Sequence, residues 1–371
     1  MPRVTCYHLQ FESGLHVGAQ GIGQEDSLAM VPSDTLFSAL VAASLERHGA
    51  PAVWGAAFAG PQEAPFLLGS AFPYAGEVRF YPLPHVDWAR LGLPEGVDVK
   101  RLRRLRFISE GIWRRVVAGA SLADLYPAEG GGAFLQGGAL WLGKDEVAGL
   151  PGWMREMSWR GARRSRPLEA LPHLELWQVH RTPRVTVDRL SSASEIYYTG
   201  RAAFAPGCGL WFPVAWLRPE APSAGGRPWR ATFDEALHAL GDAGLGGERS
   251  GGYGGFRWHV GGEEEWPQPA AGRPFVTLSR YHPRAEELPA AFEGATVAYQ
   301  LASVAGYLHA PGVASQRRRR LWLVAEGSVL TALPWQVMGD LTDVAPVVGS
   351  FPHPVWRYGL ALPVPLEVAH A

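Results

Sequence analysis

The chain has 371 residues, of which 47% are hydrophobic and 19% charged, and its formal net charge is −1. This composition excludes a disordered chain, favours two or three globular domains, and gives no overall preference for a polyanion. Cys6 and Cys208 are the two cysteines, too few for a disulfide framework or a cysteine zinc cluster. The first residues lack a secretory pattern, and the uncharged stretch 294–316 is too polar to span a membrane, so we expect a cytoplasmic protein.

Strand-forming residues alternate over 3–11, which predicts a first strand. A glycine-rich loop follows. Apolar residues then recur at helical spacing from Leu36 to Leu45, with Ser33 or Asp34 placed as N-cap and Gly49 as the end of the helix. The same helix N-terminus could hold a phosphate through its free N–H groups.

The stretch from about 75 to 175 is predicted to be an insertion that contains one basic amphipathic helix. Its apolar face comprises Leu102, Leu105, Ile108, Ile112 and Val116. Residues 100–115 carry seven basic side chains against one acid, Glu110. Further arginine clusters occur at 160–166 and 317–320, and the target of the latter is unknown. RNA, an acidic partner or solvent could face the basic helix.

Two strand patterns, at 177–190 and 196–204, are joined by the polar SSASE and predict a hairpin. A second helix is expected from a capping box of Thr232 and Glu235 to about Gly241. A last strand covers 256–260. Taken in order, these elements resemble a βαββαβ ferredoxin-like unit with insertions.

After a polar linker at 261–273, strand patterns return in a smaller second domain that begins at about residue 274. They cover 275–281, 297–309, 320–330 and 358–368.

The sequence lacks the common signatures of enzymes. It has no Walker A motif, no dinucleotide fingerprint, no H-E-x-x-H, no C-x-x-C and no G-x-S-x-G. We therefore expect no catalytic residues, no metal and no cofactor.

Residues 244–255 contain seven glycines in twelve positions. Successive N–H groups of such a turn can form a nest for an anion, and a bare backbone can approach RNA closely. Arg249 and Arg257 could pair with phosphates, and Tyr253 could stack on a base. The alternative is a loop that simply packs against its neighbours.

Five segments, in order, resemble subunit 4 of the Csm (type III-A CRISPR) complex, a member of the RAMP superfamily. GGERSGGYGGF resembles the glycine-rich loop of that superfamily. The other matching segments are 11–40 with its LHVG and SDTLFSAL, the basic segment 100–119, the hairpin 183–204 with P-R-x-x-x-D-R, and LSRYHP (278–283) with WRYGLALPV (356–364). Residues 120–175 show no such match.

The resemblance implies an α+β protein with two ferredoxin-like domains, at 1–262 and 274–371. It implies a thumb hairpin at 180–200, beside the insertion at 75–175 and the glycine-rich loop at 244–255. It also implies a non-catalytic subunit that binds the 5′ tag of the CRISPR RNA. This subunit would join the large polymerase-palm subunit to the backbone RAMP subunits in antiviral defence.

We expect the thumb hairpin to displace a nucleotide at the boundary between tag and guide, with Asp188 orienting an arginine; a salt bridge within the hairpin is the alternative for Arg184 and Arg189. The predicted RNA-binding residues are His16, Gly18, Ser33, Arg184, Arg189, Arg249, Ser250, Gly251, Gly252, Tyr253 and Gly254.

Two other functions stay open. A RAMP endoribonuclease that processes precursor CRISPR RNA would use His16 as general acid or base; His16 could equally contact RNA or hold the structure together. A protein-binding scaffold would use the glycines and arginines at interfaces.

Overall fold

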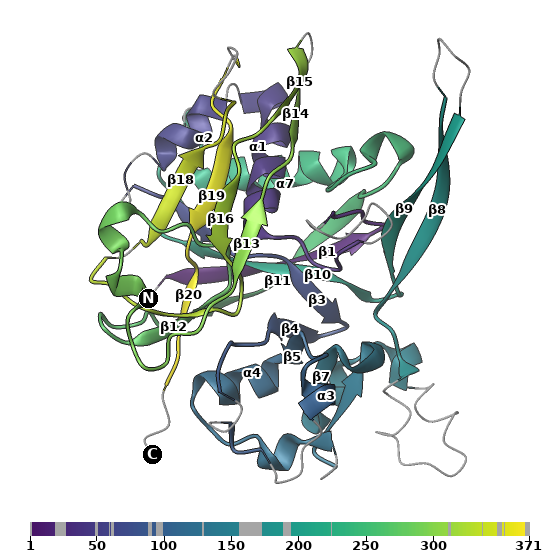
Figure 1. Cartoon of the computed structure of the whole chain (residues 1–371), viewed down its shortest axis with the longest axis vertical. Coiled ribbons are helices and arrows are strands. Elements are labelled where there is room, and N and C mark those ends of the chain that lie inside the picture. The colour runs from purple at the N-terminus through teal and green to yellow at the C-terminus, as the bar shows by residue number, and fades with distance from the viewer. Residues whose placement is uncertain are drawn as a thin grey trace.

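The structure is a computed structural model of the chain. It describes residues 2–18, 27–48, 51–58, 60, 63–87, 91–93, 99–127, 130–155, 173–187, 194–223, 225–310, 313–335, 337–346, 351 and 353–367. These residues form a mixed α+β fold, which confirms the predicted class (Figure 1).

A nine-stranded sheet runs through the molecule in the order β11-β1-β10-β3-β4-β5-β7-β6, with β2 also paired to β10. The parallel pair β5 and β7 makes the sheet mixed. Its strands are β1 (Arg3–Phe11), β2 (Phe66–Leu68), β3 (Phe72–Ala75), β4 (Val78–Pro82), β5 (Phe107–Ser109), β6 (Gly132–Leu135), β7 (Leu140–Gly143), β10 (Cys208–Trp216) and β11 (Phe256–Glu265).

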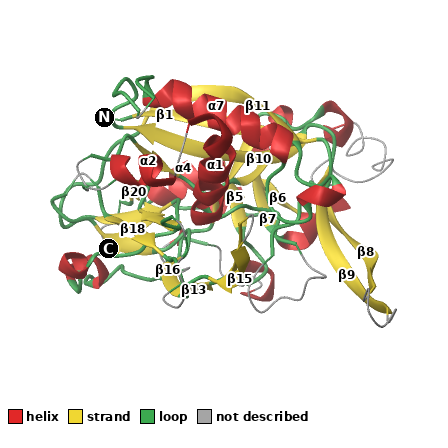
Figure 2. Cartoon of the chain, turned by 90° about the horizontal axis from the view of Figure 1, so that it is seen from above, coloured by secondary structure: helices red, strands yellow, loops and turns green. Residues whose placement is uncertain are grey.

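Three helices, α1 (Ser33–His48), α2 (Pro51–Ala57) and α7 (Trp229–Ala243), lie on one side of the sheet (Figure 2). Helix α1 packs between α7 and β19 (Trp356–Leu360), so it lies between the sheet and the C-terminal strands. No helix in the described part of the chain is long and apolar enough to span a membrane.

Both predicted helix caps are wrong. Helix α1 begins at Ser33, and the carbonyl of Pro32, one residue earlier, accepts the hydrogen bond from Leu36 N at 2.9 Å. Helix α7 begins at Trp229 after Pro228, without a side-chain cap. Thr232 Oγ1 instead donates to Ser223 Oγ at 2.9 Å.

The single basic helix predicted in the insertion is broken into α3 (Val99–Leu102), β5 and α4 (Glu110–Val117). Phe107 and Ile108 pair with β7, and Ser109 pairs with Phe80 of β4. Tertiary strand pairing therefore overrides the helical spacing. The five apolar residues of the predicted face are nevertheless buried in the core.

The C-terminal region is built from short strands. They are β12 (Pro274–Thr277) between β17 (Val329–Thr331) and β20 (Pro363–Pro365), and the pairs β13 (Leu301–Val304) with β16 (Leu321–Val324), β14 (Tyr307–Ala310) with β15 (Val313–Arg317), and β18 (Gly339–Asp343) with β19. Within the described part of 274–367, helical structure is limited to two 3-10 turns, Ala285–Glu287 and Ala290–Phe292.

The predicted linker at 261–273 is partly wrong. Strand β11 continues to Glu265, because Gly262 to Glu265 pair with the first residues of β1. The domain boundaries at 262 and 274 stay a prediction.

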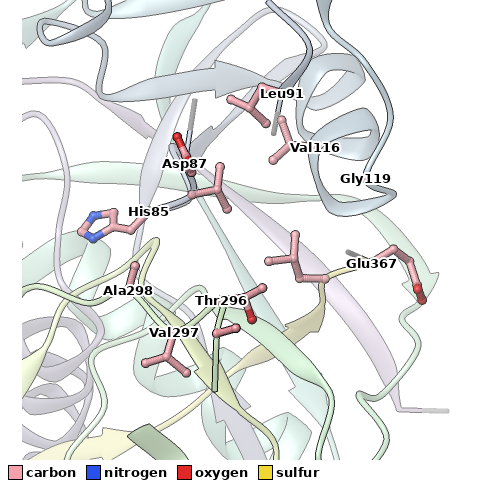
Figure 3. A pocket seen from close by; sticks show the side chains of 12 residues that line it. His85, Asp87, Leu91, Val116, Gly119, Thr296, Val297, Ala298 and Glu367 are labelled. Carbon is pink, nitrogen blue, oxygen red and sulfur yellow. The ribbon is translucent and has the colours of Figure 1, made fainter. Parts of the chain in front are cut away.

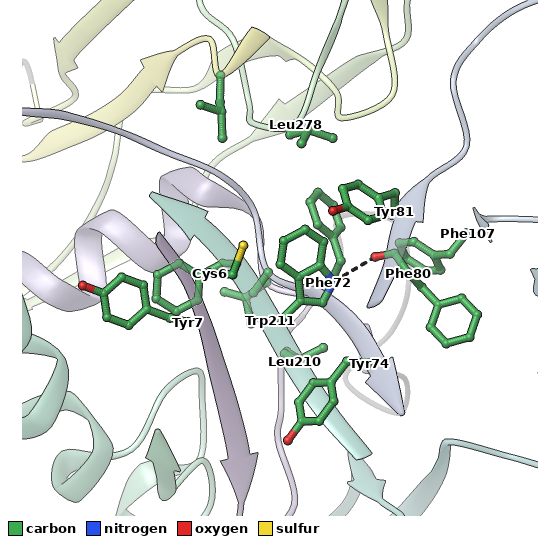
Figure 4. Packing of buried hydrophobic residues seen from close by; sticks show 14 of the residues in the cluster. Cys6, Tyr7, Phe72, Tyr74, Phe80, Tyr81, Phe107, Leu210, Trp211 and Leu278 are labelled. Atoms are coloured by element: carbon green, nitrogen blue, oxygen red, sulfur yellow. Dashed lines mark hydrogen bonds between the residues drawn. The ribbon is translucent and has the colours of Figure 1, made fainter. Parts of the chain in front are cut away.

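The core is rich in aromatic side chains from neighbouring strands (Figure 4). Trp211 of β10 is fully buried and donates from Nε1 to the carbonyl of Phe80 at 3.0 Å. Tyr7 of β1 stacks on Phe212 with 5.3 Å between ring centroids. Burial raises the pKa of both thiols, Cys6 and Cys208, to about 12, so neither is a reactive thiolate.

His8, in the middle of β1, is expected to make the protein acid-sensitive. It is 7% exposed, and its Nε2 has no hydrogen-bond partner among the described residues. Burial, and then the neighbouring His259 and Arg79, lower its pKa from 6.5 to about 4. Between these pH values the unfolded chain binds a proton that the folded chain does not. The free energy of unfolding should therefore fall by about 3 kcal/mol as the pH falls across this window.

Urea unfolding of the wild type and of His8→Gln at a series of pH values measures this contribution. The variant should lose less stability on acidification. Equal slopes in the two proteins would contradict the role of His8.

Candidate nucleic-acid interface

A long hairpin projects from the body of the protein (Figures 1 and 2). It consists of β8 (Trp177–Val187) and β9 (Ser194–Phe204), paired antiparallel throughout. Its strands agree with the predicted hairpin. The tip, 188–193, lies outside the described residues, and with it the predicted Asp188 and Arg189.

The two faces of the hairpin differ in chemistry. Because strand residues alternate, Thr182 and Arg184 share one face with Arg201, which pairs opposite His180. We call this the inner face. The outer face carries exposed apolar side chains, Val185 (56% exposed), Ile196 (64%) and Tyr198 (45%).

The inner face contacts Tyr253 of the glycine-rich loop. The guanidinium carbons of Arg184 and Arg201 lie 5.6 and 5.7 Å from the centroid of the Tyr253 ring. A hydrogen bond with Thr182, and then the hydrogen bond and charge of Arg184, lower the pKa of the Tyr253 phenol. The residue is 8% exposed. Tyr253 therefore holds the hairpin against the loop. Its ring is covered in this structure, whereas the sequence analysis had suggested a ring free to stack on a base.

The amides of Gly251, Gly252 and Gly254 are not free to form the predicted anion nest. Residues Arg249–Gly251 make a 3-10 turn. The N–H groups of Gly251 and Gly252 donate within this turn, to Glu248 O and Arg249 O, each at 2.9 Å. Gly254 N donates to Gly14 O at 3.0 Å. What the loop presents to solvent is the exposed stretch from Arg249 to Gly252, with the Arg249 and Ser250 side chains.

Some of the glycines are required by packing. Gly254 has φ +81°, and a Cβ there would lie 2.0 Å from the carbonyl oxygen of Leu245. Gly246 has φ +93°, and a Cβ would lie 2.3 Å from His16 O. Gly251 differs, because its Cβ would meet only the flexible end of Arg184, at 2.9 Å from Nη2. The packing interpretation therefore holds for Gly246 and Gly254, while an approach of RNA to the exposed glycines stays a prediction.

His16 connects the hairpin to the loop. Its Nδ1 donates to the carbonyl of Gly200 in β9 at 2.6 Å, and its own carbonyl accepts from Gly247 N at 2.8 Å. Gly18 is exposed, and a Cβ added there would meet no atom within 4 Å. His16 thus lies among the predicted site residues, at the base of the hairpin.

Ser33 does not fit the predicted site. It is fully buried, and its Oγ accepts a hydrogen bond from Arg280 N at 2.9 Å. The hydroxyl is therefore not accessible to RNA in this structure. It joins α1 to the C-terminal region.

Sequence reasoning missed Arg201 and Thr182. The strand register was the available signal, because a hairpin closed by residues 188–193 places Arg201 opposite His180 and on the face of Arg184.

A separate cavity of about 240 Å³ lies between the insertion and the C-terminal strands (Figure 3). Its described lining combines apolar side chains such as Leu91 and Val116 with the carboxylates of Asp87 and Glu367, and none of these described residues is Lys or Arg. This charge disfavours a phosphate ligand. Among the described residues, no group of three His, Cys, Asp or Glu side chains is arranged to hold a metal ion.

The fold is that of subunits from type III-A CRISPR complexes. Over 99% of this chain and 100% of the other, it matches a chain of the Csm3-Csm4 subcomplex of the type III-A CRISPR-Cas interference complex, with a TM-score of 0.63 and 13% identity. Over 100% of both chains it matches a chain of a Csm1-Csm4 cassette in complex with cA4, with a TM-score of 0.55 and 17% identity. Such identities show the fold alone.

A sequence comparison identifies the family of one region more specifically than the fold likeness does. Residues 271–366 match the family model of the CRISPR Csm4 C-terminal domain. The chain therefore carries a Csm4 C-terminal domain, and the resemblance to subunit 4 of the Csm complex is confirmed. No curated protein matches the sequence.

Proposed function

We propose that this protein is the non-catalytic Csm4 subunit of a cytoplasmic type III-A CRISPR effector, where it binds the 5′ tag of the CRISPR RNA. It bridges the polymerase-palm subunit and the backbone RAMP subunits. Support comes from the Csm4 C-terminal domain and from the whole-chain fold likeness to chains solved with Csm1 and with Csm3.

The observation that carries the RNA-binding role is the cluster of arginines where the hairpin meets the loop. Arg184 and Arg201 flank Tyr253, and Arg249 is exposed on the loop. No described carboxylate lies within 4.0 Å of these three guanidinium groups. Uncompensated guanidinium groups on a preformed surface suit phosphate groups.

The topology supports a ferredoxin-like unit for the N-terminal domain. Strands β11, β1, β10 and β3 are neighbours in that order and all antiparallel. Helices α1 and α7 follow β1 and β10, as in a βαββαβ unit. The glycine-rich loop lies between the last helix and the last strand of this unit.

The hairpin suits the role of a wedge. Its exposed outer face offers Val185, Ile196 and Tyr198 as apolar surfaces on which an unstacked base can rest. Arg184 on the inner face, and Arg189 at the tip, would hold the flanking phosphates. Displacing one nucleotide costs only a few kcal/mol, which such contacts offset.

Gly251→Phe tests the proposal, because the new side chain needs only the flexible end of Arg184 to shift and then occupies the exposed loop surface. Affinity for a labelled RNA that carries the repeat-derived 5′ tag should fall at least about tenfold, as for the loss of a charge-assisted hydrogen bond. Unfolding curves should stay close to wild type. Gly225→Phe is the control, since Gly225 is exposed, a Cβ there would meet nothing within 4 Å, and the residue lies outside the loop.

Unchanged RNA affinity in Gly251→Phe would refute the role of the loop. Cleavage of the RNA that stops in His16→Ala would instead establish the endoribonuclease. Binding to Csm subunits without any RNA would leave a scaffold.

A further inference from the structure

The C-terminal region contains a locally basic stretch that the proposed tag site does not use. No Asp or Glu occurs between Glu293 and Glu326, whereas residues 317–320 are four consecutive arginines. In a chain with a net charge of −1, this stretch is a local concentration of positive charge.

Aromatic and apolar side chains are exposed in the same stretch. In the pair β13–β16, Leu301 lies opposite Val324 and Ser303 opposite Trp322. Leu301 is 48% exposed and Trp322 57% exposed, whereas Leu323, on the other face, is fully buried. Val324 shares the face of Leu301 and Trp322 but is buried, so this face is covered in part, and Leu301 and Trp322 are its exposed side chains.

The neighbouring hairpin β14–β15 adds an ordered arginine on an aromatic ring. Tyr307 pairs with Arg317 across the strands and is 53% exposed. Arg317 Nε donates to the Tyr307 hydroxyl at 2.9 Å, and its guanidinium carbon lies 5.4 Å from the ring centroid. Arg319 is held by hydrogen bonds from its backbone N to Val344 O at 3.0 Å and from Nη2 to Asp343 O. These side chains are oriented before any ligand binds.

The arginines are not neutralised. No described carboxylate lies within 4.0 Å of the guanidinium groups of Arg317, Arg319 or Arg320. All three residues are exposed. Free guanidinium groups beside exposed rings combine phosphate pairing with base stacking, the two interactions that single-stranded RNA requires.

We propose that the arginine–aromatic surface, comprising Leu301, Tyr307, Arg317, Arg319, Arg320 and Trp322, binds a single-stranded RNA segment. This segment is distinct from the one held by the glycine-rich loop. The strands that carry the surface and the projecting hairpin both lie toward the lower edge of Figure 2, on one side of the molecule. An RNA strand that leaves one site can therefore continue toward the other without passing around the protein.

Binding of a labelled oligouridylate to the full chain tests the inference. Trp322→Ala and Tyr307→Ala should each weaken binding roughly fivefold or more, through loss of a stacking surface. In the double variant Arg319→Gln, Arg320→Gln, the fall of log affinity with log salt should become less steep. The change in slope should be about 0.7 for each phosphate that the variant no longer pairs. Ultraviolet crosslinking to a 4-thiouridine version of the probe should place RNA on peptides that contain Tyr307 or Trp322.

Leu288→Ala is the matched control, because Leu288 is an apolar residue, 52% exposed, outside the surface. It should leave binding unchanged. The inference is wrong if the Trp322 and Tyr307 variants bind oligouridylate like the wild type and no crosslink reaches their peptides. If those variants instead lose a Csm subunit while RNA binding persists, the surface is a protein interface. The tag-binding role is read separately from Gly251→Phe, so the two proposals can fail independently.

Discussion

Replacing Asp34 with asparagine should lower the free energy of unfolding by about 3–5 kcal/mol, the range for breaking a buried ion pair from one side. Asp34 is 1% exposed, and its Oδ2 accepts a hydrogen bond from Arg357 Nη1 at 2.6 Å. Arg357 is 5% exposed. Without the carboxylate, its charge would remain buried and uncompensated.

A second guanidinium group depends on the same carboxylate. Burial, and then the charge of Arg357, lower the pKa of Arg318 to about 10, while Asp34 acts in the opposite direction. Asp34 is thus the counter-charge for two arginines. We therefore expect the loss of stability to lie toward the upper end of the range.

Urea denaturation measures the effect, with Asp124→Asn as control. Asp124 pairs with Arg115 at 2.6 Å on the surface. The unfolding curve of the Asp124→Asn protein should therefore superimpose on that of the wild type. Adding Arg357→Met to Asp34→Asn should recover part of the loss, because no unpaired charge then remains at that position. An Asp34 variant as stable as the Asp124 variant would show that the buried pair contributes little.

The second large effect is expected at Gly254, where alanine should destabilise the protein by about 2–5 kcal/mol. Gly252 and Gly254 both have φ +81°. At Gly252 a Cβ meets nothing within 4 Å, so alanine there should cost only the strain of the left-handed backbone, about 1–2 kcal/mol. At Gly254 the Cβ would also lie 2.0 Å from Leu245 O, which adds overpacking of about 1–3 kcal/mol.

Because the two positions share one backbone angle, the difference between the variants measures the crowding alone. Both should be tested by urea unfolding and by binding of the tag RNA. Gly254→Ala should weaken both, since relief of the crowding displaces the loop. Equal unfolding midpoints for the two variants would mean that the loop relaxes at no cost.

Local patterns were reliable where the neighbouring chain alone decides the structure. The first strand coincides with Arg3–Phe11, and the helix that contains Leu36 to Leu45 is present as Ser33–His48. The prediction of one helix at 100–115 was wrong. The apolar residues of this segment can be buried either by one continuous helix or by the turn, strand and helix that the structure has, so their spacing alone does not distinguish the two. Pairing with residues far along the chain decided between them.

The candidate site shows the same division. Its location on the hairpin and the glycine-rich loop could be predicted from composition and resemblance. The covered ring of Tyr253, the contribution of Arg201 and the internal use of the loop amides could not, since they depend on how two separate segments meet. Ser33 was misassigned for the same reason, because its partner, Arg280, lies 247 residues away.

The position of β1 between β10 and β11 has a consequence for synthesis on the ribosome. Arg3 pairs with Trp216 on one side and with Glu265 on the other. At about 5–20 residues per second, the first strand would wait on the order of tens of seconds for its neighbours to emerge. Throughout that delay its apolar residues, including Val4 and Leu9, have no sheet to join. Premature termination before β10 would therefore release a fragment in which β1 has neither of its sheet neighbours.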